Sequence, residues 1–96
     1  MSAYLVVEVS YQDLAWTEAY RRDVPQMVAA FGGRYLARSP HPELIEGERS
    51  LPDTLAILEF PSAEAARALL AAPEYQPYAE ARRKGATTAI MLLEAA

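Results

Sequence analysis

The first candidate for chemistry is a glutamate on a strand-like apolar run. Glu59 lies near the end of the run Thr54–Phe60, and Glu8 has a similar phase in the run Tyr4–Val9. A carboxylate withdrawn from water finds a cation or hydrogen-bond donors, or its pKa rises, which is also how a general base is tuned. We therefore predict Glu59 as a catalytic acid or base. The alternative is a structural carboxylate at a strand end, exposed or paired with an arginine.

Two arginines are candidates for holding an anionic ligand. Arg38 ends one strand-like run, and Arg82 lies on the apolar side of a helix-like segment. A guanidinium offers two parallel donors to a carboxylate or phosphate, so both are predicted as ligand-binding residues. The alternative is that they form internal ion pairs with Glu46 and Glu59, the usual state of a semi-buried arginine.

Two tyrosines could form the walls of a pocket between helices and sheet. Tyr20 and Tyr75 each offer an aromatic surface and one hydroxyl group, and we predict both as ligand-binding residues. Tyr20 shares a helical stripe with Trp16, and such a stripe is also typical of ordinary core packing. Core packing therefore remains the alternative for both tyrosines.

Other classes of chemistry find little support. The sequence contains no cysteine and one histidine, His41, which lies between two prolines, so we expect no transition-metal site. An extended Ser39-Pro40-His41 segment does not bring a nucleophile to its base. None of the four glycines belongs to a phosphate-binding loop, and no cofactor is expected. The net charge of -4 argues against nucleic acid as a partner.

Length and composition predict one soluble domain over residues 1–96. Hydrophobic residues make up 52% of the chain and charged residues 23%, which is ordinary for a globular protein. No stretch approaches the roughly 20 apolar residues that a membrane-spanning helix needs. We find no signal-peptide pattern at the N-terminus, and a cytoplasmic location is expected.

Apolar periodicity predicts the elements that position these residues. Strands are expected at Tyr4–Val9, at Arg34–Arg38 with a resumption through Leu44–Glu46, at Thr54–Phe60 and at Thr87–Glu94. Helices are expected from an N-cap at Asp13 to Phe31 with a kink or restart at Pro25, at Ala63–Ala71 after an N-cap at Ser62, and at Glu74–Lys84.

This order predicts an α+β fold of ferredoxin-like βαββαβ topology, with helices on one face of a four-stranded antiparallel sheet. The strands are nevertheless apolar on both faces, as the run Ala89–Leu93 illustrates. Because the chain has no spare helix to cover the second face, we expect a homodimer in which two sheets pack together.

Six short motifs occur in order along the chain. They are residues 32–38 (GGRYLAR), 46–47 (EG), 59–62 (EFPS), 65–66 (AA), 73–76 (PEYQ) and Arg82. Together they resemble the domain-of-unknown-function family 1330 of the dimeric α+β barrel superfamily. The resemblance implies the same two-sheet dimer and adds Glu46 as a second catalytic candidate, with a structural role at the Gly47 turn as the alternative. It implies no particular activity, since the superfamily includes cofactor-free oxygenases, haem-related enzymes and small-molecule regulatory domains.

Two hypotheses about function follow. In the first, each protomer has a pocket between sheet and helices, near the dimer interface, that binds or transforms a small anionic or phenolic metabolite without a bound cofactor. In the second, the domain is a non-catalytic dimerisation or interaction module with no ligand pocket, and the charged motif residues only hold strands and turns together.

Overall fold

A computed structural model describes residues 1–96 and contains one four-stranded antiparallel sheet. The strands are β1 (Ala3–Tyr11), β2 (Arg34–Ser39), β3 (Thr54–Phe60) and β4 (Ala86–Glu94), in the spatial order β2-β3-β1-β4. β1 pairs with both β3 and β4, in registers that set Leu5 opposite Leu58 and Leu92. The ferredoxin-like topology predicted from the order of elements is therefore confirmed.

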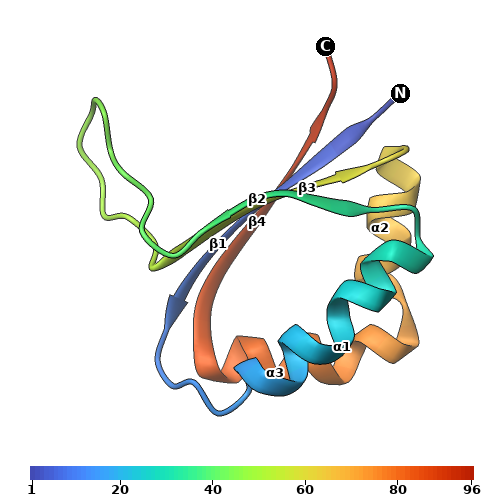
Figure 1. Ribbon diagram of the computed structural model, residues 1–96, viewed down its shortest axis with the longest axis horizontal. Coiled ribbons are helices and arrows are strands. Elements are labelled where there is room, and N and C mark those ends of the chain that lie inside the picture. Colours follow the sequence, from blue (N-terminus) through green and yellow to red (C-terminus); the bar gives the residue numbers. More distant parts are fainter.

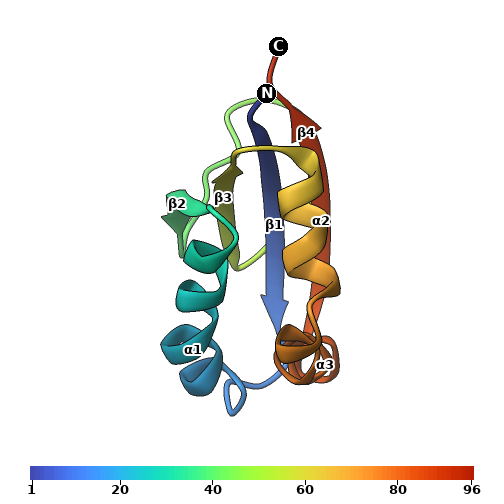
Figure 2. The same cartoon turned by 90° about the vertical axis from the view of Figure 1, so that its right-hand side faces the viewer.

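Three α-helices and one 3₁₀ turn connect the strands. They are α1 (Thr17–Ala30), α2 (Ala63–Ala71), the 3₁₀ turn η1 (Pro73–Tyr75) and α3 (Gln76–Gly85). All three helices cover one face of the sheet (Figure 1). Figure 2 shows α1 on the side of β2 and β3 and α2 on the side of β1 and β4, with α3 at one end.

The ends of two helices follow from particular residues. The Ser62 hydroxyl accepts a hydrogen bond from the Ala65 N–H at 3.1 Å, which is the N-cap predicted for α2. After α1, Gly32 adopts a left-handed φ of +81° that favours glycine. At Gly33 a Cβ would lie 2.5 Å from the Phe60 ring, so this turn packs directly on the core.

The core lies between the sheet and its helices. Eleven buried residues form one cluster, and its members from the sheet include Leu5, Leu58 and Phe60. Burying one such side chain contributes about 1.5–3 kcal/mol, so this face accounts for much of the stability of the fold.

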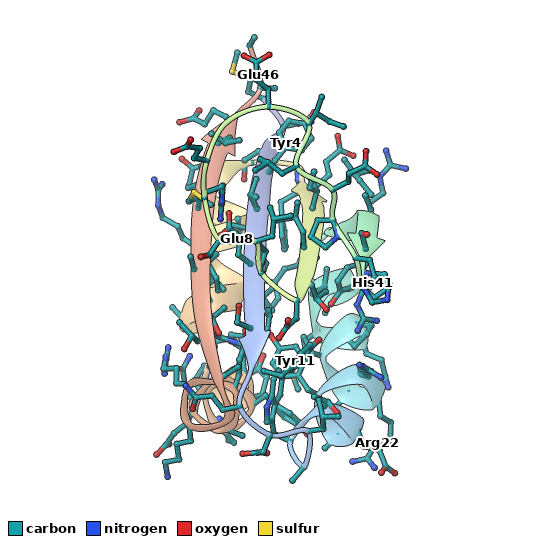
Figure 3. The ribbon with its side chains drawn as sticks, turned by 90° about the vertical axis from the view of Figure 1, so that its left-hand side faces the viewer. Tyr4, Glu8, Tyr11, Arg22, His41 and Glu46 are labelled. Atoms are coloured by element: carbon teal, nitrogen blue, oxygen red, sulfur yellow. The ribbon has the colours of Figure 1, made fainter.

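The opposite face of the sheet carries no helix and is apolar, as expected. Val6 lies between Ile57 and Met91 in the registers of β1 with its two neighbours. The side chain of Met91 is 44% exposed. Figure 3 views this face, which we call the outer face, and shows Tyr4 and Glu8 on it.

The loop between β2 and β3, residues 40–53, stands off the outer face (Figure 1). Arg49 connects the loop to the sheet, since its guanidinium forms an ion pair with Glu8 at 2.7 Å. The predicted resumption of the second strand through Leu44–Glu46 is wrong, because these residues belong to the loop and none is in a strand. Ile45 points its apolar side chain into solvent and is 84% exposed.

Two details of the first helix also differ from expectation. Asp13 is not its N-cap, because α1 begins at Thr17 and the Asp13 carboxylate instead accepts a hydrogen bond from the Ala15 N–H at 3.0 Å. Asp13 thus shapes the turn that precedes the helix. The helix also continues through Pro25 without a restart.

One carboxylate ties α1 to α3, the two helices that enclose one end of the molecule. The Asp23 carboxylate accepts a hydrogen bond from the Tyr78 hydroxyl at 2.6 Å and also pairs with Arg22. The Arg22 hydrogen bond, followed by that of Tyr78, lowers the pKa of Asp23 to about 2. A folded-state pKa below the unfolded one stabilises the fold above the unfolded pKa, and this stabilisation is lost as pH falls towards the folded pKa.

We therefore expect Tyr78→Phe to weaken this acid dependence. Between about pH 5 and pH 2 the wild type should lose the Asp23 contribution to its free energy of unfolding, whereas the variant should lose less because its Asp23 pKa is closer to the unfolded value. Urea unfolding midpoints of the two proteins across this range provide the measurement. An identical pH dependence of the unfolding midpoints of both proteins would contradict the role of Tyr78 in lowering the pKa of Asp23.

Candidate functional site

A cavity of about 250 Å³ lies between the sheet and the helices. Fifteen of its 21 lining residues are hydrophobic, and the lining comes from all four strands, from α1, α2 and α3, and from η1. This volume is just below the usual range of about 300–1,000 Å³ for ligand sites, so the cavity suits a small metabolite.

The buried end of the cavity carries a cluster of three polar side chains, which we call the inner cluster: Tyr20, Tyr75 and Arg82. The hydroxyl groups of Tyr20 and Tyr75 lie 2.7 Å apart and share a hydrogen bond between α1 and η1. Both tyrosines pack on the core, which is the alternative considered for them, and both also line the cavity.

Arg82 is a buried guanidinium without a counter-charge. It is 5% exposed, it forms no ion pair, and its Nε is buried with no hydrogen-bond partner. Burial, reinforced by the neighbouring Tyr75 hydroxyl, raises the pKa of Tyr20, so Tyr20 stays a neutral phenol and does not supply a negative charge. A buried charge without a partner is costly, which makes Arg82 the feature of the cavity that most needs an explanation.

The open end of the cavity carries a second cluster of polar side chains, which we call the outer cluster: Tyr11, Arg21, Arg38 and Thr54. The same four residues also line an adjoining, more open hollow towards His41. The Tyr11 and Thr54 hydroxyls lie 3.0 Å apart. Arg21 and Arg38 are exposed and form no ion pair.

A row of aromatic rings connects the two clusters along one wall. The ring centroids of Tyr11 and Trp16 are 5.9 Å apart, those of Trp16 and Tyr20 are 5.3 Å apart, and those of Tyr20 and Tyr75 are 6.2 Å apart. Gly85, at the end of α3, allows this packing, because a Cβ there would collide with the indole of Trp16. The rings of this wall therefore come from β1, from the start of α1 and from η1, and the end of α3 packs against Trp16.

The charge of the cavity is opposite to that of the protein. The chain has a net charge of -4, yet the cavity is lined by three arginines and by no aspartate or glutamate. All four ion pairs of the structure lie elsewhere. Positive charge in a largely apolar cavity attracts an anion far more strongly than the same charge does in water.

The two predicted catalytic carboxylates do not line this cavity. Glu59 lies on the outer face and pairs with Arg34 at 2.9 Å, and Glu46 is an exposed residue of the loop. Figure 3 shows Glu46 at the opposite end of the molecule from Tyr11. The internal ion pairs considered for Arg38 and Arg82 with these glutamates are therefore absent.

Thus the four predicted ligand-binding residues share one cavity, whereas the predicted acids lie outside it. Tyr11, Arg21 and Thr54 also line the cavity and were not among the residues predicted from the sequence. No group of three or more His, Cys, Asp or Glu side chains is placed to hold a metal ion, and none of the helices has the length and apolarity needed to cross a membrane.

Comparison with protein families gives one assignment. A family described as a domain of unknown function (DUF1330) matches residues 2–96. No protein with a curated description matches the chain.

Several solved structures share the fold. A protein of unknown function from Rhodopseudomonas palustris, RPA0582, is 18% identical with a TM-score of 0.80, covering 99% of this chain and 82% of its own. SnoaB from Streptomyces nogalater, a cofactor-independent oxygenase, is 19% identical with a TM-score of 0.66 and coverages of 99% and 93%. A dimeric ferredoxin-like protein of unknown function from Jannaschia sp. CCS1 is 11% identical with a TM-score of 0.66 and coverages of 99% and 100%. At these identities the similarity shows the fold alone.

Proposed function

The chain belongs to the DUF1330 family, and we propose that it binds a small molecule with an apolar body and an acidic oxygen in the cavity beside Arg82. The observation that carries this proposal is the buried guanidinium of Arg82, which has no carboxylate partner and whose Nε makes no hydrogen bond. A carboxylate or phenolate at this point would supply the missing counter-charge and accept charge-assisted hydrogen bonds.

The neighbouring hydroxyls suit the same ligand. Tyr20 and Tyr75 share one hydrogen bond, which uses one of their two hydroxyl protons and leaves the other free to donate to a ligand oxygen. Because burial raises the pKa of Tyr20, its hydroxyl stays protonated at neutral pH. An oxyanion would therefore meet a guanidinium and a neutral phenol donor.

Chemistry without a cofactor is compatible with this site. A preorganised guanidinium in an apolar cavity stabilises negative charge that develops on a substrate oxygen, such as the oxygen of an enolate or phenolate. SnoaB, which shares the fold, is a cofactor-independent oxygenase. A catalytic role of Glu59 or Glu46 stays a prediction, and in this protomer neither carboxylate reaches the cavity from its present position.

We further propose that the protein is a homodimer formed through the outer faces of two sheets. Both carboxylates on this face, Glu8 and Glu59, are paired with arginines of the same chain, so packing a second sheet there leaves no carboxylate without a partner. The neighbour from Jannaschia is described as dimeric. The sheet would then separate each cavity from the interface. A cytoplasmic location also remains a prediction.

Thermal unfolding with matched ligands tests the pocket. Benzoate, phenylacetate and 4-hydroxybenzoate are compared with their neutral amides, which have nearly the same shape but no charge. We expect acids at 100 times their dissociation constant to add about 2.7 kcal/mol to the free energy of unfolding, and the amides to add much less. Equal stabilisation by acids and amides, or none by any compound, would contradict the proposal.

A further inference from the structure

The cavity has a second set of anion-binding groups at its mouth that the proposed function does not use. Arg21 and Arg38 reach it from α1 and β2, and neither forms an ion pair. Three other surface arginines, Arg22, Arg34 and Arg49, pair with a carboxylate of this chain, whereas the exposed Arg67 and Arg83 form no ion pair. The guanidiniums of Arg21 and Arg38, neither in an ion pair, thus both lie at the mouth of the cavity.

Two hydroxyl groups lie at the same mouth as these guanidiniums. The hydroxyls of Tyr11 and Thr54 bond to each other at 3.0 Å, and both residues line the cavity as well as the hollow outside it. Burial alone raises the pKa of Tyr11, but the Thr54 hydroxyl and the Arg21 and Arg38 guanidiniums outweigh it, so the pKa is lowered. The Tyr11 hydroxyl therefore lies in a positive field.

One acidic residue is near this mouth. The Asp53 carboxylate lines the outer hollow but not the cavity, and it accepts a hydrogen bond from the backbone N–H of Tyr11 at 2.9 Å. It forms no ion pair with either arginine. The charges of Arg21 and Arg38 thus remain without a bonded carboxylate.

The two clusters are separated by an apolar middle. Trp16 lies between the rings of Tyr11 and Tyr20, and Val7, Leu58 and other aliphatic side chains form much of the remaining wall. A ligand with one acidic group would leave one cluster without a partner. A ligand with a ring-sized apolar body and an acidic group at each end would satisfy both.

Building on the proposed function, we propose that the cavity takes a two-ended acid. One acidic oxygen binds the inner cluster at Arg82, and the second binds an outer anion site formed by Arg21, Arg38 and the hydroxyls of Tyr11 and Thr54. The class of ligand is a compact aromatic or alicyclic molecule with acidic groups, carboxylate or phenol, on opposite sides of its body.

Calorimetric titration with paired acids tests this ligand class. Benzoate is compared with 1,4-benzenedicarboxylate, and phenylacetate with 1,4-phenylenediacetate, in the wild type, in the double variant Arg21→Gln/Arg38→Gln and in the control Arg67→Gln. Arg67 is exposed on α2, forms no ion pair and does not line the cavity. Arg21 and Arg38 are exposed as well, so their replacement leaves the core intact.

We expect at least one diacid to bind the wild type and the control about tenfold or more tightly than its monoacid, because charge-assisted hydrogen bonds are the strong ones. In the double variant this preference should vanish, because both acids then meet only the inner cluster. If monoacids bind but no diacid is preferred, or if the preference survives in the double variant, the outer site is refuted and the proposed function stands. Binding of neither class in any protein would contradict both.

Discussion

Arg82→Met is expected to make the unliganded protein more stable. Methionine keeps most of the length and the apolar stem of the side chain but removes the buried charge and the unpaired Nε donor. An unsatisfied buried donor costs about 1–3 kcal/mol, so the free energy of unfolding should rise by about that amount. Most substitutions of core residues instead lower the free energy of unfolding.

The matched control is Arg83→Met, one residue further along α3. Arg83 is exposed and lies in the same last helical turn, so it shares any interaction with the helix dipole but not the burial of Arg82. Urea unfolding of the three proteins without ligand gives the comparison. A clear loss of stability in Arg82→Met alone would mean that Arg82 is a structural residue and not a ligand-binding one.

Val6→Lys is expected to convert the dimer to a monomer. Val6 lies in the middle of the outer face between Ile57 and Met91, and in a symmetric interface each substitution occurs twice. Two buried ammonium groups without partners should raise the dimer dissociation constant by at least about 100-fold. The β-strand itself should tolerate the change, because lysine is accommodated on a solvated sheet face.

Sedimentation velocity across a concentration series measures this effect. Ala68→Lys serves as the control, since Ala68 is exposed on α2, on the helical side of the molecule. The wild type and the control should sediment as dimers and Val6→Lys as a monomer. A monomeric wild type, or a variant that dimerises as strongly as the wild type, would refute the sheet-to-sheet interface.

The sequence was sufficient for the fold because several local signals agreed with one another. The Ser62 cap and the alanine-rich run after it predicted α2 with the bounds Ala63–Ala71 that the structure has. In β3 the residues at alternate positions point to opposite faces, and apolar residues occur at both sets of positions, which indicated two apolar faces. The bare outer face could therefore be inferred from the order and polarity of the elements, because the chain lacks an element to cover it.

The loop was misread for a physical reason. Leu44-Ile45-Glu46 has the apolar character of a short strand, but the prolines before it and Gly47 after it confine it to a connection that pairs with no strand. A hydrophobic pattern over three residues is too short to outweigh such flanking residues.

Only part of the candidate site could be predicted from the sequence. Helical spacing placed Arg82 on the same side as Tyr75 and Ala79, which is where the structure buries it. The phase of β3 could also have separated Glu59 from Arg82, since Glu59 shares its parity with Ile57 on the outer face, whereas Leu58 faces the core. Ion pairing between distant elements cannot be read from spacing within one element.

Of the three residues of the mouth that the sequence did not predict, Tyr11 and Arg21 were missed for different reasons. Tyr11 lies two positions beyond the predicted end of the first strand, and extending the alternation would have placed it in phase with Leu5 and Val9. Arg21 has no comparable signal, because it follows the apolar stripe of α1 as an ordinary charged neighbour. Only the packing of α1 against β2 brings it to the cavity.

Calorimetric titration of the wild type, Arg82→Met and Arg83→Met with the tightest-binding acid tests the central claim most directly. We expect the ligand to bind the wild type and Arg83→Met with one site per protomer. In Arg82→Met its affinity should fall by about 10- to 100-fold, as the loss of a charge-assisted hydrogen bond implies. Undiminished binding to Arg82→Met would contradict the assignment of Arg82 as the anion-binding residue of this cavity.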